Sequence, residues 1–194
     1  MGFFVTSTGP GDGANLGGLA GADQHCQNLA AAAGAGDRTW RAYLSQSAGF
    51  GGPEAVNARD RIGTGSWHNA NGDLIAASIA DLHGDFEHDR NNIRKPSAVD
   101  EDGNLVNGVG DQPNQHDVLT GSDSHGRALI GRNPQVTTCN NWTSNGEGNA
   151  MVGHHDRLGG PNSSWNAAHF SRGCSQENLV STGGTGFLYC FATD

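Results

Sequence analysis

Residues 18–45 read GLAGADQHCQNLAAAAGAGDRTWRAYLS, and this stretch decides the class of fold. Its first half places Leu19, Ala22, Cys26 and Leu29 at steps of three and four, the spacing of an amphipathic helix. The glycine-rich GAG that follows predicts where the helix ends. The second half, RTWRAYLS, alternates side chains in the manner of a strand with one face in the core, which puts Trp40 on the core side and Tyr43 on the opposite side. The stretch therefore indicates a fold that contains both helix and sheet.

Working outward, four other segments predict strands or turns. Residues 2–8 (GFFVTST) have the aromatic and β-branched composition of a first strand, and residues 185–194 (TGFLYCFATD) form an apolar run typical of a sheet centre. An Asn-Gly pair in residues 67–76 and an Asp-Gly pair in residues 99–108 predict two hairpins. A short helix opened by a proline is predicted over residues 53–62.

Composition limits the classes of function. At 194 residues the chain is predicted to form one domain, residues 1–194, with a core of its own. Its 31 glycines and 16% charged residues favour a loop-rich architecture of short strands. The net charge of −9, with 11 scattered basic residues, argues against binding to nucleic acid. No apolar run reaches the roughly 18 residues of a membrane span, so none is predicted.

The chain has four cysteines, and none is part of a C-x-x-C pair. An even number at these spacings favours two disulfides over a cysteine-ligated zinc site, although the sequence alone leaves the connectivity open. Two disulfides predict an oxidising location: secreted, periplasmic or on the cell surface.

The order of these features resembles the endostatin-like branch of the C-type lectin fold, found in C-terminal domains of certain collagens and in bacterial surface proteins. The resemblance is carried by residues 18–45, TGSDSHGRAL (120–129), CNNW (139–142) and YCFA (189–192). It implies an α+β, C-type lectin-like fold with short helices on a small, mostly antiparallel sheet and long loops. It also implies two nested disulfides, which pair Cys26 with Cys190 and Cys139 with Cys174.

In this fold ligands bind in the long loop region, which here is the polar segment 140–169. The resemblance therefore predicts a secreted or surface-displayed binding module that recognises an extracellular protein or a glycan. The sequence has neither an E-P-N or Q-P-D triplet nor W-N-D, and QPN at 112–114 lies outside the segment, so calcium-dependent sugar binding is not expected. The contact candidates are Asn141, His154, His155, Asp156, Trp165 and His169.

Histidines and carboxylates also suggest a metal site, with zinc or calcium as the candidate ions. His154, His155 and Asp156 are candidate ligands, joined either by His169 or by His116 and Asp117. Adjacent histidines point in different directions on an extended chain, so at most one of the pair is expected to coordinate. The alternative is that these are loop histidines bonded to backbone carbonyls.

Two further segments bear on metal binding. The N-terminal histidine cluster that holds zinc in collagen-derived members is absent, because no histidine precedes His25. The oxygen-rich DEDGN (100–104) has the composition of a calcium loop but is better explained as a plain Asp-Gly turn.

An enzyme is not expected. Ser122 and Asp123 with His125, or the serines 163 and 164 near His169, supply the residue types of a nucleophile and a base, but neither set occurs in a G-x-S-x-G motif. Two alternatives to a binding module remain: a metal-dependent enzyme of unknown substrate, and a structural domain that assembles as a homo-oligomer.

Tryptophans offer a last candidate surface. Trp142 follows Cys139 at a position where this fold buries an aromatic residue, and it is predicted to be core. Trp67 and Trp165 lie among glycine, serine and asparagine residues and are candidates for exposed platforms that stack on a ligand.

Overall fold

The computed structural model describes residues 1–49, 52–85, 91–130, 133–160 and 162–194. The strands are β1 (Phe3–Val5), β2 (Trp40–Ala42), β3 (Trp67–His68), β4 (Leu74–Ala76), β5 (Asp117–Leu119), β6 (Met151–His154), β7 (His169–Phe170) and β8 (Gly184–Ala192). The helices are α1 (Gly18–Ala32), α2 (Ile79–His83), α3 (Cys139–Trp142) and α4 (Gln176–Val180), with 3-10 turns η1 (Ala58–Asp60) and η2 (Pro134–Val136). This is the predicted α+β class, with short helices and small, mostly antiparallel sheets.

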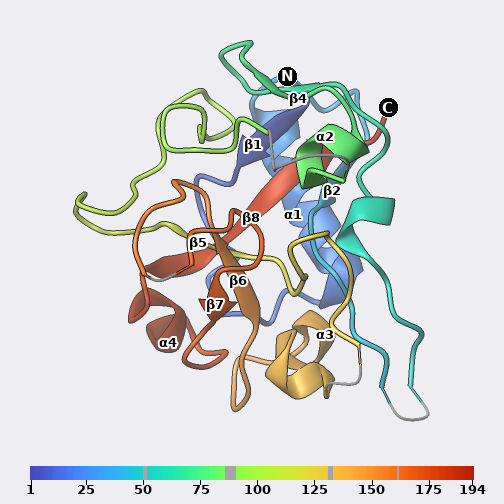
Figure 1. The fold of residues 1–194 in the computed structure, drawn as a ribbon, viewed down its shortest axis with the longest axis vertical. Coiled ribbons are helices and arrows are strands. Elements are labelled where there is room, and N and C mark those ends of the chain that lie inside the picture. Colours follow the sequence, from blue (N-terminus) through green and yellow to red (C-terminus); the bar gives the residue numbers. More distant parts are fainter. Residues whose placement is uncertain (50–51, 86–90, 131–132, 161) are drawn as a thin grey trace.

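The main sheet is built around β8 (Figure 1). Its order is β1-β8-β5-β6-β7, and β2 also pairs with β8; β3 and β4 form a separate hairpin. β8 runs antiparallel to β1 and β2 and parallel to β5. Strands from the two ends of the described chain, β1 and β8, therefore lie side by side.

The residues of β8 alternate between two hydrophobic clusters because successive side chains of a strand point to opposite faces. One cluster, which includes the buried face of α1, receives Leu188, Cys190 and Ala192. The other receives Phe187, Tyr189 and Phe191. A strand buried on both faces has no polar side, and this explains the continuous apolar run in the sequence.

The predicted helix and both disulfides are confirmed. α1 buries Ala22, Cys26 and Ala30, and one disulfide joins Cys26 to Cys190 on β8. The other joins Cys139 to Cys174. The pairing implied by the resemblance is the pairing in the structure, and all four cysteines are used.

Three aromatic predictions were wrong and one is confirmed. Tyr43 was expected on the solvent side of its strand but is fully buried, because the second cluster covers that face. Trp67 and Trp165 are each 1% exposed and cannot act as platforms. The ring centroid of Trp165 lies 4.9 Å from that of Tyr43, inside the core. Trp142 is buried as predicted.

The positions of the predicted turns agree with the structure better than the predicted lengths of the strands and helices do. Residues 67–76 form the β3–β4 hairpin. Residues 99–108 contain a single bridge, and the Asp100 carboxylate accepts the backbone N–H groups of Asp102 and Asn104, as in a plain turn. The helix predicted over residues 53–62 is only the short turn η1.

The segment 140–169 is less of a loop than predicted. It contains β6, which is mostly buried, and it ends at the first residue of β7. The histidine and glycine of MVGH hide the strand from a hydropathy pattern, yet both are buried. The segment therefore belongs partly to the sheet. Within the described ranges, no helix has the length and apolar character needed to cross a bilayer.

Candidate metal centre

The sheet brings an aspartate and two histidines to one face. Asp117, the first residue of β5, is the cross-strand partner of His154, the last residue of β6. On the other side of β6, His169 pairs with Val152, two residues before His154. Residues that are opposite each other, or two apart along a strand, share a face, so these three side chains converge. His116 joins them from the residue before β5, and its ring stacks on His154 with centroids 4.1 Å apart.

The Asp117 carboxylate is the centre of this cluster. Its Oδ1 atom lies 3.3 Å from His116 Nε2, 3.3 Å from His154 Nε2 and 3.4 Å from His169 Nε2. In a tetrahedral zinc site with metal–ligand bonds of about 2.0–2.1 Å, neighbouring donor atoms are about 3.3–3.4 Å apart. The separations from Asp117 Oδ1 thus have the size expected of donors around one ion.

Several polar atoms of the cluster are buried without hydrogen-bond partners. The side chains of His116, Asp117 and His154 are 7%, 3% and 2% exposed. Both carboxylate oxygens of Asp117 and both ring nitrogens of His154 lack a hydrogen bond. Buried polar atoms are nearly always paired, and an unpaired buried charge costs several kcal/mol. A bound cation would satisfy these atoms together.

Without an ion, neighbouring imidazoles balance the carboxylate. Burial acts to raise the pKa of Asp117, but the imidazoles of His154 and His169 face it and hold that pKa below its ordinary value. The Asp117 carboxylate in turn raises the pKa of His169. The cluster therefore favours a positive charge beside Asp117, and a metal ion would also provide such a charge.

Asp156 lies behind His116 and not among the donors. Its Oδ1 is 3.4 Å from His116 Nδ1, the ring nitrogen that faces away from Asp117. Burial acts to raise the pKa of Asp156, yet the His116 imidazole and the backbone N–H groups of Val109 and Leu158 lower it, so it stays ionised. Carboxylates in this position orient a histidine ligand and make it a better donor. If His116 ligates an ion, Asp156 would position its ring.

His155 points away from the cluster. It is fully buried, and its Nε2–H donates to the backbone carbonyl of Asn107 at 3.0 Å. Burial lowers the pKa of His155. His155 therefore lies outside the cluster, whereas its neighbour His154 lies in it. This is the behaviour that the alternation of an extended chain predicts.

Two other contact candidates have structural roles. Trp165 is buried in the core, as described above. Asn141 uses its side chain to hold the backbone of Ser47: its Oδ1 accepts the Ser47 N–H and its Nδ2 donates to the Ser47 carbonyl. Of the six residues predicted to contact a ligand, only His154 and His169 belong to the cluster, with Asp156 beside it.

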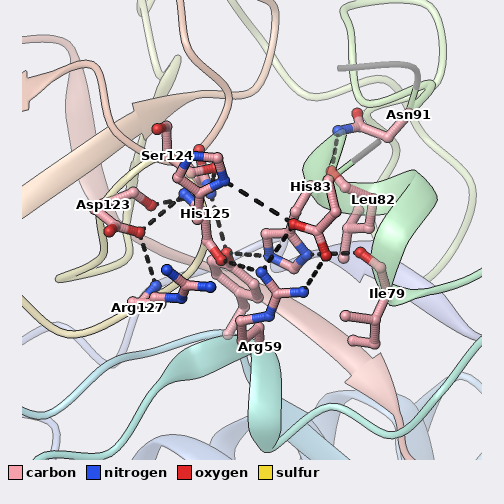
Figure 2. Close-up of polar contacts among 12 residues, drawn as sticks. Arg59, Ile79, Leu82, His83, Asn91, Asp123, Ser124, His125 and Arg127 are labelled. Carbon is pink, nitrogen blue, oxygen red and sulfur yellow. Dashed lines mark hydrogen bonds and ion pairs between the residues drawn. The ribbon is translucent and has the colours of Figure 1, made fainter. Parts of the chain in front are cut away.

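The serine–histidine pairs considered for catalysis do not form. The Ser122 hydroxyl is buried and bonds to the Ser45 hydroxyl at 2.8 Å. The carboxylate of Asp123 accepts the backbone N–H of His125 and does not orient its ring (Figure 2). In the second pair, the Ser164 hydroxyl donates to Asn166 Oδ1.

A second polar cluster surrounds His83 (Figure 2). His83 Nδ1–H donates to the Ile79 carbonyl, so its Nε2 accepts the hydrogen bond from the Tyr43 hydroxyl at 2.8 Å. Burial lowers the pKa of His83 to about 4. Nearby, Arg59 binds both carboxylate oxygens of Asp85. These groups are paired with one another, and the cluster is explained as part of the folded core.

Together, these features define a disulfide-stabilised α+β protein with a buried histidine–aspartate cluster at one end of its sheet. None of the protein-family models matches the chain, and no curated protein matches it significantly. The sequence pointed to His154 and His169 but gave His116 and Asp117 only as an alternative to His169. The signal for His116 and Asp117 was the polar start of an otherwise apolar strand, HDVL, which marks buried polar residues.

Proposed function

We propose that this protein binds one divalent transition-metal ion, with zinc the best match, through His116, Asp117 and His154. The observation that carries the proposal is the buried Asp117 carboxylate, which lacks hydrogen bonds and faces three imidazole nitrogens at 3.3–3.4 Å. The donor atoms of these three residues lie within 4.8 Å of one another.

The donor set favours zinc over calcium. Imidazole nitrogen suits zinc, copper, nickel and iron, whereas calcium takes six to eight oxygen ligands. The cluster offers several nitrogens and a single carboxylate. The oxygen-rich turn at residues 100–104 does not replace it, because the Asp100 carboxylate is engaged by its own backbone. No cysteine is free to supply a thiolate.

The ion would act as a cross-link within a binding module. Asp117 and His154 are on neighbouring strands, so a shared ion ties β5 to β6 and fixes the segment 140–169 against the sheet. The two disulfides support this proposal, because disulfides persist in oxidising environments such as the cell exterior. We therefore propose an extracellular-type module that recognises a protein or glycan partner through a surface held in shape by zinc.

Zinc titration of the metal-free full-length chain tests the proposal. The wild type is expected to bind one zinc ion per chain. Asp117→Asn keeps the size of the side chain but removes the charge, and it is expected to lower the affinity by at least about 100-fold, as loss of a direct ligand must exceed the 10–100-fold effect of an outer residue. Asp102→Asn is the matched control, because Asp102 is an exposed turn residue.

The histidines are tested in the same way. His154→Ala is expected to abolish stoichiometric binding, whereas His125→Ala changes a half-exposed histidine outside the cluster and should not. Zinc binding that survives both Asp117→Asn and His154→Ala would place the ion elsewhere and overturn the proposal. Circular dichroism of each variant establishes that it is folded.

A further inference from the structure

His169 differs from the other three residues of the cluster. Its side chain is 38% exposed, against 7% or less for His116, Asp117 and His154. It lies outside the set of three mutually close donors, although its Nε2 is 3.4 Å from Asp117 Oδ1. An ion held by the three buried residues would therefore have one side that is turned toward His169 and solvent.

The orientation of the His169 ring is fixed by the backbone. The Phe170 carbonyl can only accept, so the 3.0 Å contact requires that His169 Nδ1 carries the hydrogen. In the neutral ring, Nε2 then directs its lone pair toward the cluster. His169 is on β7, a strand of two residues that, among the described strands, pairs with β6 alone. Its attachment is therefore weaker than that of Asp117 or His154, which are fixed by strands inside the sheet.

The net charge of the ion and its protein ligands determines which kind of ligand would bind on the side that faces His169. A divalent ion held by one carboxylate and two neutral imidazoles keeps one net positive charge together with its direct ligands, and the ionised Asp156 lies behind His116, out of contact with the ion. A bound cation is the largest local charge in such a site and attracts anionic donors. The protein as a whole carries a net charge of −9, so this would be a local positive site on an acidic molecule.

We infer that the metal ion has an exchangeable coordination position on the His169 side, and that this position binds a carboxylate. The inference rests on the proposed metal site. It assigns His169 to the rim of that position, in place of a permanent fourth ligand. Zinc sites with three protein ligands and an open fourth position exchange their outer ligand, whereas sites with four protein ligands are closed. The carboxylate comes either from a free organic anion or from a side chain of a bound partner.

Cobalt(II) substitution tests this, because the visible absorption of cobalt reports the number and type of its ligands. The cobalt-loaded, full-length wild type is titrated with acetate. We expect a saturable change of spectrum, which Asp117→Asn, a variant that lacks a buried ligand, does not show. His169→Ala is expected to lower the cobalt affinity by less than about tenfold, which is less than the 10–100-fold loss typical when a residue that supports a metal ligand is removed. The variant is also expected to keep the change of spectrum with acetate.

A closed site gives the opposite pattern. If the wild-type spectrum is unchanged by acetate while His169→Ala responds, His169 is the fourth ligand and the inference is wrong. If cobalt does not bind at all, the proposed metal site fails and the inference fails with it. These two failures are distinguished by the cobalt spectrum before any acetate is added.

The source of the carboxylate is resolved by a second titration. An amidated, acetylated peptide with one glutamate is compared with acetate, and the same peptide with glutamine is the control. Tighter binding of the glutamate peptide than of acetate assigns the position to a partner's side chain, and equal affinity assigns it to free organic anions. Binding of the glutamine peptide as tight as that of the glutamate peptide would contradict a carboxylate ligand.

Discussion

Gly183 lies against the ring of His116, and this contact tests the role of that histidine. Its φ is +99°, and an added Cβ would lie 2.9 Å from His116 Cδ2 and 2.8 Å from Asn114 Nδ2. Gly183→Ala is therefore expected to displace the ring. Since changes that disturb the support of a metal ligand typically cost about 10–100-fold in affinity, zinc titration should show a loss of that order.

Gly72→Ala is the matched control, because Gly72 has a similar φ of +89° but no atom near its added Cβ. Both substitutions place an L-residue in the left-handed region and should cost about 1–2 kcal/mol of stability. Only Gly183→Ala should change the affinity for zinc. Equal zinc affinity in the two variants would mean that His116 is not held in place as a ligand.

His83 predicts a dependence of stability on pH. Burial lowers its pKa from 6.5 to about 4 in the folded protein, so between these values the unfolded chain binds a proton that the folded chain does not. The free energy of unfolding should therefore fall as the pH falls from 6.5 to 4, by roughly 3 kcal/mol at about 1.4 kcal/mol per pH unit. Urea denaturation of metal-free protein over this pH range measures the effect.

The variant His83→Gln separates this contribution from those of other groups. Tyr43, Arg59, Asp85 and His125 surround His83 and are unchanged in the variant. The difference in stability between wild type and variant should shrink, or reverse in sign, as the pH falls through this range. A difference that is constant with pH would show that His83 does not titrate as proposed.

At the scale of single residues, the sequence predicted apolar positions better than polar ones. Cys26 and Trp142 were placed in the core by spacing and by resemblance. Trp67 and Trp165 were misjudged because their polar neighbours in sequence are not their neighbours in space. The histidine–aspartate cluster depends on the register that sets Asp117 opposite His154, and pairing between strands far apart in the chain cannot be derived from local periodicity.

At the scale of elements, α3 is an unusual helix. All four of its residues have positive φ, from 47° at Cys139 to 66° at Trp142, so it is one left-handed turn. This conformation costs about 1–2 kcal/mol for each L-residue. The turn is held by the disulfide of Cys139, by the amide of Asn141 on Ser47 and by the hydrogen bond from Trp142 Nε1 to the Ser45 carbonyl.

Asn140 tests the cost of this turn, since its side chain is exposed and its φ is +57°. Asn140→Val puts a β-branched residue in the left-handed region and should lower the free energy of unfolding by about 1–2 kcal/mol. Asn140→Gly should be neutral or stabilising by up to about 1 kcal/mol, because glycine adopts this conformation freely. Both variants lose the contact with Thr143, so urea denaturation compares backbone effects. Equal stability would contradict a strained turn.

The elements that could be predicted were those with a strong local pattern. α1 has its apolar stripe, β8 its continuous apolar run, and the β3–β4 hairpin its Asn-Gly turn. β6 was missed because its sequence, MVGH, contains a glycine that is required by close packing: a Cβ on Gly153 would lie 1.8 Å from the Trp165 carbonyl oxygen. The left-handed α3 has no signature in sequence beyond its two asparagines.

At the scale of the whole molecule, two kinds of cross-link would act on different parts of the chain. The Cys26–Cys190 disulfide spans 164 residues and joins α1 to β8, whereas the Cys139–Cys174 disulfide spans 35 residues and closes the region that contains β6 and β7. A zinc ion would add a third link, between β5 and β6. The disulfides stabilise the fold by restricting the conformations of the unfolded chain. The ion would bind only the folded sheet, so the stabilisation by zinc depends on the concentration of free zinc.

Zinc is therefore expected to raise the melting temperature of the oxidised protein. At a free zinc concentration 100 times the dissociation constant, binding contributes about 2.7 kcal/mol, which for a domain of this size is a rise of about 5–10 °C. Thermal denaturation in zinc and in chelator measures it. Asp117→Asn should remove the rise. Calcium should not raise the melting temperature of the wild type, because most donor atoms of the cluster are nitrogens and calcium prefers oxygen ligands. An equal rise in Asp117→Asn would mean that zinc stabilises the fold through other histidines, and the sheet-end cluster would lose its assigned role.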